Sequence, residues 1–129
     1  MTGVTIKPIV LVVDDEPFNR DLLRRVLFRD YEVLKAYDAD SAMTVLLGQA
    51  VDVIVCDHVM PGRSGAQLAR EVRQMFPHTM ALLLTGYEDA PEIGEARRDG
   101  VVLDVLGKPW APARLKQAIA DAVRLAREA

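Results

Sequence analysis

Continuous apolar runs alternate along the chain with segments in which apolar residues recur every three or four positions. The continuous runs predict buried strands, and the spaced positions predict amphipathic helices. The expected strands are 9–13, 31–36, 51–56, 80–84 and a segment within 101–106. The first expected helix starts at Pro17, a residue that suits a first helical turn. The next three cover 39–49, 65–75 and part of 88–100, and the last starts at about 111.

Five strand–helix units in regular alternation predict one α/β domain over residues 1–129. We expect a doubly wound, five-stranded parallel sheet with helices on both faces. Strands 9–13, 51–56 and 80–84 are the most uniformly aliphatic, so they should lie at the centre of the sheet.

The segment 88–100 should hold the weakest helix and be the most mobile part of the fold. Pro91, Gly94 and Gly100 interrupt it, and Ile93 is its only large aliphatic residue. A glycine inside a helix costs roughly 0.5–1 kcal/mol relative to alanine, and regions with few buried contacts open at low free energy.

Polar residues follow four of the expected strands at the point where each strand ends. They are Asp14-Asp15-Glu16, Asp57, Thr85 and Lys108. Each alone is well explained as a helix cap or a solvated side chain, but no such explanation covers all four strand ends at once. In a parallel sheet these ends share one edge, so the side chains should converge there.

The converging residue types indicate a phosphoryl site that uses a metal ion. Three carboxylates placed together repel unless a cation joins them, and hard oxygen ligands suit Mg²⁺. Lys108 adds a positive point charge for a phosphoryl group. The sequence therefore predicts a Mg²⁺-dependent phosphoryl site at this edge.

Composition and charge limit the expected cellular location of the protein and the classes of partner that it can bind. A net charge of −3 gives no general case for direct nucleic-acid binding. Four arginines cluster in one segment, and we interpret them as part of a solvated helix face: Arg20, Arg24, Arg25 and Arg29. Cys56 lies in an apolar run and should be a buried, inert thiol. With no signal-peptide pattern and no stretch of about 20 apolar residues, we expect a cytoplasmic protein without membrane insertion.

In its motifs the chain resembles the receiver domain of bacterial two-component response regulators. The matching pieces, in the expected order, are VLVVDDEP at 10–17, VIVCDHVMPGRSG at 53–65, LLLTGY at 82–87 and GKPW at 107–110. The resemblance covers essentially the whole chain. It implies a flavodoxin-like, receiver-like sheet and a phosphoprotein that serves signal transduction as a phospho-acceptor module in a phosphorelay, not as an enzyme.

By that resemblance, Asp57 accepts a phosphoryl group from a sensor histidine kinase or a histidine phosphotransfer protein, and the domain then changes conformation to signal to an output partner. Asp15 and Asp57 would bind Mg²⁺ directly, together with the backbone carbonyl of Val59. Asp14 would act mostly through a metal-bound water.

The resemblance assigns Thr85 and Lys108 to phosphoryl oxygens and makes the Lys108–Pro109 peptide bond cis. Val59 and Tyr87 would line the route by which water attacks the phosphoryl group, so we expect them to tune its lifetime and to make it long. Val105 departs from the family, since many receivers carry an aromatic switch residue there.

Two further positions, Trp110 and His58, stand beside the motif residues. Trp110 stands where phenylalanine is commoner, and we interpret it as a half-buried packing residue. The pairing of TGY with KPW resembles receivers attached to HD-GYP phosphodiesterases or found in hybrid kinases. His58 follows the acceptor in a tight loop, and we interpret it as a surface histidine whose side chain points away from that of Asp57.

Two other functions fit the expected fold but not the residues after its first strand. A Mg²⁺-dependent phosphohydrolase of the haloacid dehalogenase type needs Asp-x-Asp after its first strand, whereas Asp14 and Asp15 are adjacent. A flavodoxin-like cofactor binder needs a phosphate loop there, and acids would repel phosphate. The sequence leaves open the cognate kinase, the output domain, the oligomeric state (a homodimer included) and whether the chain is part of a longer one.

Overall fold

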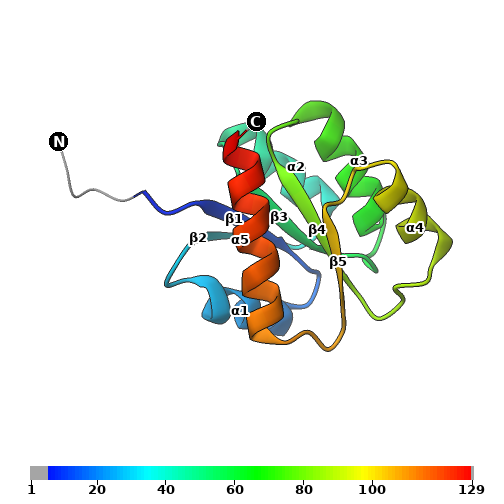
Figure 1. Ribbon diagram of the computed structural model, residues 1–129, viewed down its shortest axis with the longest axis horizontal. Helices are drawn as coiled ribbons and strands as arrows, with labels where there is room; N and C mark the ends of the chain where they lie inside the picture. The colour runs from blue at the N-terminus through cyan, green and yellow to red at the C-terminus, as the bar shows by residue number, and fades with distance from the viewer. Residues whose placement is uncertain (1–5, 129) are drawn as a thin grey trace.

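The computed structural model describes residues 6–128, which form a parallel sheet between two layers of helices (Figure 1). Apolar runs pair into the strand order β2-β1-β3-β4-β5, and every pairing is parallel. The expected central strands β1, β3 and β4 occupy the middle. In chain order the elements are β1 (Ile9–Val13), α1 (Pro17–Leu27), β2 (Glu32–Ala36), α2 (Ala39–Gly48), β3 (Val53–Asp57), α3 (Gly65–Met75), β4 (Met80–Thr85), α4 (Pro91–Arg98), β5 (Asp104–Gly107) and α5 (Pro112–Glu128).

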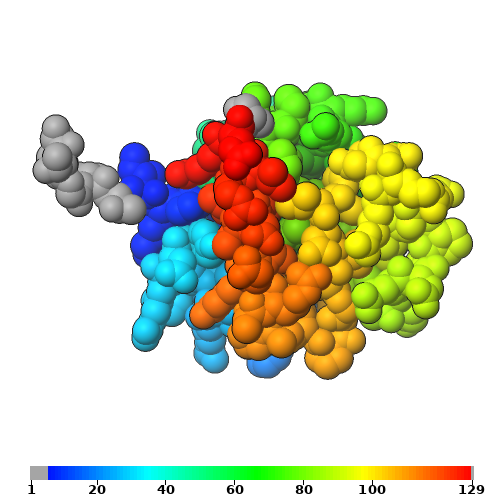
Figure 2. Space-filling model, in the orientation of Figure 1, coloured from blue at the N-terminus to red at the C-terminus, as the bar shows by residue number. Residues whose placement is uncertain are grey.

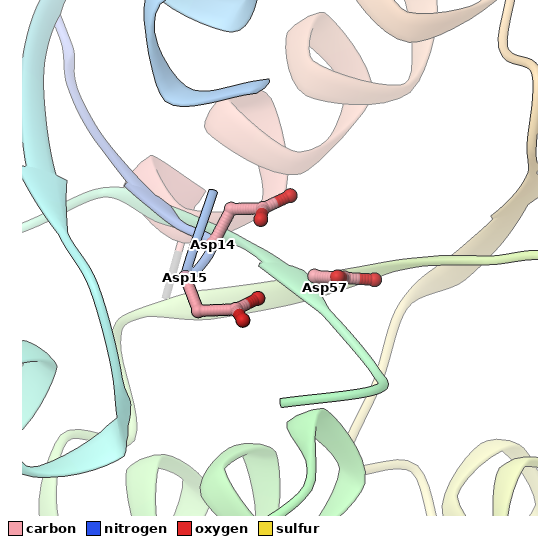
Figure 3. A group of neighbouring side chains, drawn as sticks. All are labelled: Asp14, Asp15 and Asp57. Carbon is pink, nitrogen blue, oxygen red and sulfur yellow. The ribbon is translucent and has the colours of Figure 1, made fainter. Parts of the chain in front are cut away.

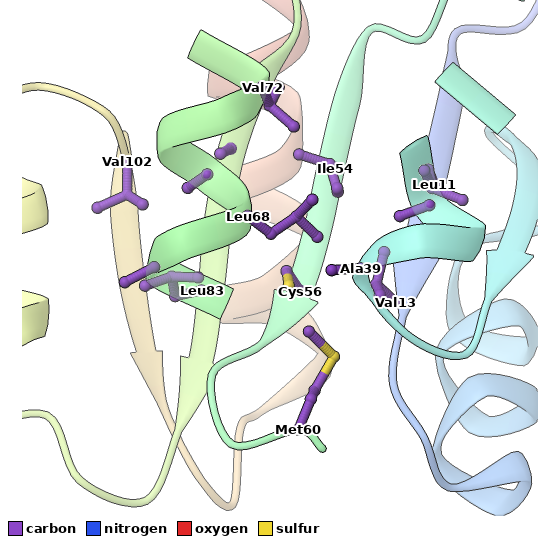
Figure 4. Packing of buried hydrophobic residues seen from close by; sticks show 14 of the residues in the cluster. Leu11, Val13, Ala39, Ile54, Cys56, Met60, Leu68, Val72, Leu83 and Val102 are labelled. Carbon is purple, nitrogen blue, oxygen red and sulfur yellow. The ribbon is translucent and has the colours of Figure 1, made fainter. Parts of the chain in front are cut away.

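Alternate residues of the central strands point to opposite faces, and this divides the core in two. Leu11, Ile54 and Leu83 pack with residues of α2, α3 and α4, as Figure 4 shows for part of this cluster. On the other face, Val12 and Leu82 pack with residues of α1 and α5. The doubly wound fold predicted from the sequence is therefore confirmed, with three helices on one face and two on the other.

The strand boundaries of β2 to β5 differ by one or two residues from those predicted, and at the start of β3 the structure shows a physical reason. We expected β3 to begin at Val51, but it begins at Val53. The Val51 carbonyl accepts a hydrogen bond from the Thr79 hydroxyl at 2.7 Å, so a side chain takes the place of a ladder partner there. At its other end β3 includes Asp57, which pairs with Leu84 of β4. The acceptor candidate is thus held by the sheet itself.

The expected weak helix is present but short. α4 has Pro91 in its first turn, and its N-cap residue Ala90 offers no side-chain hydrogen bond. Only Ile93 and Ala96 of this helix are buried.

Across residues 6–128, no helix combines the length and apolar character that a membrane crossing requires.

Candidate functional site

The four strand ends singled out from the sequence do meet at one edge of the sheet. Asp14 directly follows β1, Asp57 ends β3 and Thr85 ends β4. Lys108 follows the last residue of β5. Because the strands are parallel and in register, backbone geometry alone brings these residues to the same edge.

Three carboxylates form the centre of the site. Asp14, Asp15 and Asp57 each offer an oxygen, and these oxygens all lie within 4.8 Å of one another. In Figure 3 the side chains of Asp14 and Asp15 extend toward that of Asp57. Hard oxygen donors at this spacing suit a divalent cation such as Mg²⁺, so the residues present fit the metal predicted from the sequence.

Burial makes this cluster electrostatically costly without a cation. Asp14 is 1% exposed and Asp57 is 7% exposed, whereas Asp15 is exposed. Burial is the main cause that raises the pKa of Asp14, and the neighbouring Asp57 raises it further. The Glu16 backbone N–H, which donates to Asp14 Oδ1 at 2.9 Å, acts in the opposite direction on that pKa, as does Lys108.

A lysine and a threonine complete the edge on the β4–β5 side. Lys108 donates from Nζ to Asp57 Oδ1 at 2.9 Å, and its backbone N–H donates to the Thr85 carbonyl at 2.9 Å. The Thr85 hydroxyl oxygen accepts from the Tyr87 N–H at 2.9 Å, so its own proton can be donated elsewhere. The Lys108–Pro109 peptide bond is cis, as the family resemblance implied.

A glycine that sequence reasoning did not single out fixes the loop after Asp57. A Cβ built at Gly65 would lie 2.6 Å from the Asp57 carbonyl oxygen and 2.8 Å from His58 Cα. Its N–H donates to the His58 carbonyl at 2.9 Å. The loop can therefore fold tightly against the start of α3 because no side chain stands at position 65. The one available signal was the glycine just before an apolar helical repeat.

The surface interpretation of His58 is wrong. The side chain is 9% exposed, its Nδ1 accepts from the Ala66 N–H at 3.3 Å, and its Nε2 lies 3.5 Å from Glu92 Oε2. The first N–H groups of a helix lack partners within the helix, and the ring of His58 supplies one for α3. Neither this role nor the contact with Glu92 could be read from the sequence.

The other singled-out residues occupy contrasting environments. Val59 is 59% exposed and Tyr87 is 69% exposed, so both side chains are largely open to solvent. Val105 is buried in the core at 4% exposure. Trp110 is partly buried against the α1–α5 cluster, as expected for a packing residue. Cys56 is buried as predicted, and burial is the main cause that raises the pKa of its thiol.

An apolar hollow of about 350 Å³ adjoins the site, and the sequence did not predict it. Asp14, which belongs to the carboxylate cluster, and Lys108 both line this hollow. The remaining lining includes Leu22, Val26 and Trp110. Leu22 is 39% exposed because it lies at this opening and not under the sheet.

Comparison with known proteins gives a consistent result. A family model described as "Response regulator receiver domain" matches residues 10–120. The hydrogenase transcriptional regulatory protein HoxA of Cupriavidus necator is 39% identical over 114 residues, which are 88% of this chain and 24% of that protein. The cyclic di-GMP phosphodiesterase response regulator RpfG of Xanthomonas campestris pv. campestris is 30% identical over 124 residues, which are 92% of this chain and 32% of that protein.

Solved structures agree with the sequence relatives. The signal receiver domain of an HD domain-containing protein from Pseudomonas fluorescens superposes with a TM-score of 0.90 at 29% identity, covering 99% of this chain and 95% of that one. The chemotaxis protein CheY4 of Vibrio cholerae superposes with a TM-score of 0.81 at 28% identity, covering 90% and 98%. The chain spans about a quarter of the length of the first curated relatives that it matches.

Proposed function

We propose that Asp57 is the residue that accepts the phosphoryl group. The chain belongs to the family of response regulator receiver domains. A receiver domain is a phospho-acceptor module of two-component signal transduction, not a catalytic enzyme. Membership in this family therefore argues against the alternative function as a phosphohydrolase of the haloacid dehalogenase type. The observation that carries the assignment to Asp57 is its position. Its carboxylate lies between the acids that follow β1 and the ammonium group of Lys108, which is 2.9 Å away.

We further propose that Mg²⁺ is the cation of this site. Asp15 and Asp57 would bind it directly with the backbone carbonyl of Val59, and Asp14 would act through a bound water. When bound, the ion offsets negative charge on the carboxylates and on the phosphoryl oxygens. The acidic cluster and its buried Asp14 support this role, since Lys108 offsets only part of the mutual repulsion of the three carboxylates.

The reaction proposed for the site is an in-line displacement. A carboxylate oxygen of Asp57 attacks the phosphorus of a phosphohistidine, and an oxygen–phosphorus bond forms. The phosphorus–nitrogen bond breaks, its electron pair returns to the ring nitrogen, and that nitrogen takes up a proton from solvent to leave a neutral imidazole. Lys108 then transfers its hydrogen bond from Asp57 to a phosphoryl oxygen, and the Thr85 hydroxyl donates to another. Such catalysis consists mainly of positioning and electrostatic stabilisation.

Family membership implies a histidine kinase as partner. We propose that the donor is a sensor histidine kinase or a histidine phosphotransfer protein and that the transfer takes place in the cytoplasm. Names of the relatives include a hydrogenase transcriptional regulator and a cyclic di-GMP phosphodiesterase response regulator. Outputs of these two kinds differ, so the relatives support no single output for this chain.

A direct experiment is phosphorylation by a small donor. Purified protein is incubated with acetyl phosphate, with Mg²⁺ or with EDTA, and the phosphorylated fraction is read by intact mass. We expect labelling that requires Mg²⁺ and disappears in Asp57→Asn. Asp52→Asn is a matched control, since Asp52 precedes β3 and makes an ion pair with Arg127 far from the site. Labelling that persists in Asp57→Asn or ignores EDTA would overturn the assignment.

A further inference from the structure

One carboxylate of α4 contacts two residues of the loop that follows Asp57. Glu92, in the first turn of α4, accepts a hydrogen bond from the Ser64 hydroxyl at 2.7 Å through Oε1. Its other oxygen, Oε2, lies 3.5 Å from Nε2 of His58. Glu92 therefore connects α4 both to the residue directly after Asp57 and to the N-cap of α3.

The two loop residues are themselves held firmly. The Ser64 hydroxyl oxygen accepts from the Gln67 N–H at 3.1 Å and caps α3. Nδ1 of His58 accepts from the Ala66 N–H, so the ring proton of the neutral imidazole is on Nε2 and faces Glu92. The His58 backbone N–H donates to the Leu84 carbonyl at 3.0 Å. A carboxylate at the N-terminal end of α3 is also favoured by the helix dipole.

α4 depends on this connection because the helix is weak in itself. It lacks a side-chain N-cap, contains Gly94, and buries only Ile93 and Ala96. At the other end of the helix, Asp99 forms an ion pair with Arg70 of α3 at 2.7 Å. That pair is about half exposed, and exposed pairs contribute little. Within residues 6–128, Glu92 thus provides the main polar attachment of the first turn of α4. Figure 2 shows α4, in yellow, at the outer edge of the molecule.

We propose that Glu92 is a positioning residue that couples the phosphorylation state of Asp57 to the attachment of α4. This inference rests on the function proposed above. A phosphoryl group adds negative charge at Asp57, one residue from His58, and the carboxylate of Glu92 lies 3.5 Å from the His58 ring. Like charges repel, so phosphorylation weakens the hold of Glu92 on the loop and releases the first turn of α4.

The coupling is reciprocal, because any effect of the acceptor on the α4 attachment implies an equal effect of that attachment on the acceptor. The charge of Glu92, and not only its hydrogen bond with Ser64, is what makes the attachment sensitive to phosphorylation.

The test separates charge from hydrogen bonding. Amide hydrogen exchange over 88–100 is measured with and without acetyl phosphate and Mg²⁺, in the wild type, Glu92→Gln, Glu92→Ala and Glu95→Gln. Glu95 is an exposed acid of the same helix, so Glu95→Gln removes an equal charge without touching the loop. Labelling of Asp57 is followed by intact mass in every sample.

In the wild type we expect 88–100 to exchange faster than α1 and α5, and phosphorylation to speed that exchange by about threefold, as for a repulsion at near-surface dielectric. Glu92→Gln keeps the hydrogen bond from Ser64 and should lose the response while Asp57 is still labelled. Glu92→Ala should exchange fast in both states, and Glu95→Gln should respond as the wild type does.

Two results would overturn the coupling: labelled wild type with unchanged exchange over 88–100, or Glu92→Gln that responds as the wild type does. Unlabelled wild type would instead overturn the proposed function, and the coupling with it. A merely structural role for Glu92 would slow or speed exchange equally in both phosphorylation states, so the loss of the response in Glu92→Gln is the decisive readout.

Discussion

Lys108 and Asp57 are 51 positions apart in the sequence, and the Lys108 ammonium group donates a hydrogen bond to Asp57 Oδ1 at 2.9 Å. The sheet creates this pair, since β5 and β3 both end at the same edge with β4 between them. The pair places a cation on the carboxylate that is proposed to carry the phosphoryl group. It also offsets part of the repulsion among the acids, because Asp57 belongs to the acidic cluster.

Lys108→Gln should separate these two effects. Without the ammonium group, the buried carboxylate loses a charge-assisted hydrogen bond, and we expect unfolding in EDTA to be easier by about 1–3 kcal/mol. Mg²⁺ should restore part of that loss but not the rate of labelling by acetyl phosphate. Urea titration and intact mass measure the two. Unchanged stability together with unchanged labelling would show that the pair has no role in either.

Asp14 should make the stability of the protein depend on pH. Burial and the neighbouring Asp57 raise its pKa above the usual 3.8. A carboxyl whose pKa is raised on folding favours the folded state most below pH 3.8, and this contribution is lost as pH rises through the raised value. In EDTA at pH 7, Asp14→Asn should therefore be more stable than the wild type, and its advantage should shrink as the pH is lowered toward 4. Added Mg²⁺ should stabilise the wild type more than the variant. A variant that is less stable than the wild type throughout this range would contradict the argument.

Gly65→Ala should damage the site through the backbone. The added Cβ would meet the Asp57 carbonyl oxygen and His58 Cα, and neither can move without shifting β3 or the loop. We expect a loss of about 1–3 kcal/mol, as for other overpacked sites, and slower labelling of Asp57.

Gly48→Ala is the control, because a Cβ at position 48 meets nothing within 4 Å and the residue ends α2. Alanine is the better helix former, so this variant should be as stable as the wild type or more so. Chemical denaturation of both variants decides the matter, and equal stability of Gly65→Ala and the wild type would refute the packing argument.

The lifetime of the phosphorylated protein depends on what lies on the water route. Val59 offers no hydrogen bond to orient a water, and we predict slow loss of the phosphoryl group for that reason. Tyr87 is 69% exposed, which favours the competing idea that its ring faces solvent and does not cover the site. The lifetime prediction itself remains to be tested.

Two variants test it by the decay of phosphorylated protein after removal of the donor. Val59→Asn combined with Tyr87→Glu should admit and orient water, and should speed decay more than Tyr87→Ala does. Loss of positioning changes rates by orders of magnitude, so a clear effect is expected. Rates within about twofold of the wild type in both variants would mean that the lifetime is set elsewhere.

The sequence predicted the parts of this structure that depend on local pattern. Apolar runs located the strands, and the polar residues directly after them located Asp14, Asp57, Thr85 and Lys108, because parallel strands bring their ends together by geometry. Contacts between distant loops leave no such pattern. The buried ring of His58 depends on where the start of α3 folds back.

The Ser64–Glu92 hydrogen bond likewise joins residues 28 positions apart. Only packing of α3 beside α4 brings them together, and no spacing in the sequence encodes it. Gly65 was visible as a residue, but the close approach that requires it becomes apparent only when the carbonyl of Asp57 is placed.

Chemical trapping of the acyl phosphate can identify the phosphorylated residue itself. Borohydride reduces an acyl phosphate to an alcohol, so a phosphorylated aspartate becomes homoserine and can be located by tandem mass spectrometry. Trypsin separates Asp57, in the peptide that ends at Arg63, from Asp14 and Asp15, in the peptide that ends at Arg20. After treatment with acetyl phosphate and Mg²⁺, we predict homoserine at position 57 alone and none in EDTA. Homoserine at position 14 or 15, or none at 57 in protein whose intact mass shows the label, would contradict Asp57 as the phosphorylated residue.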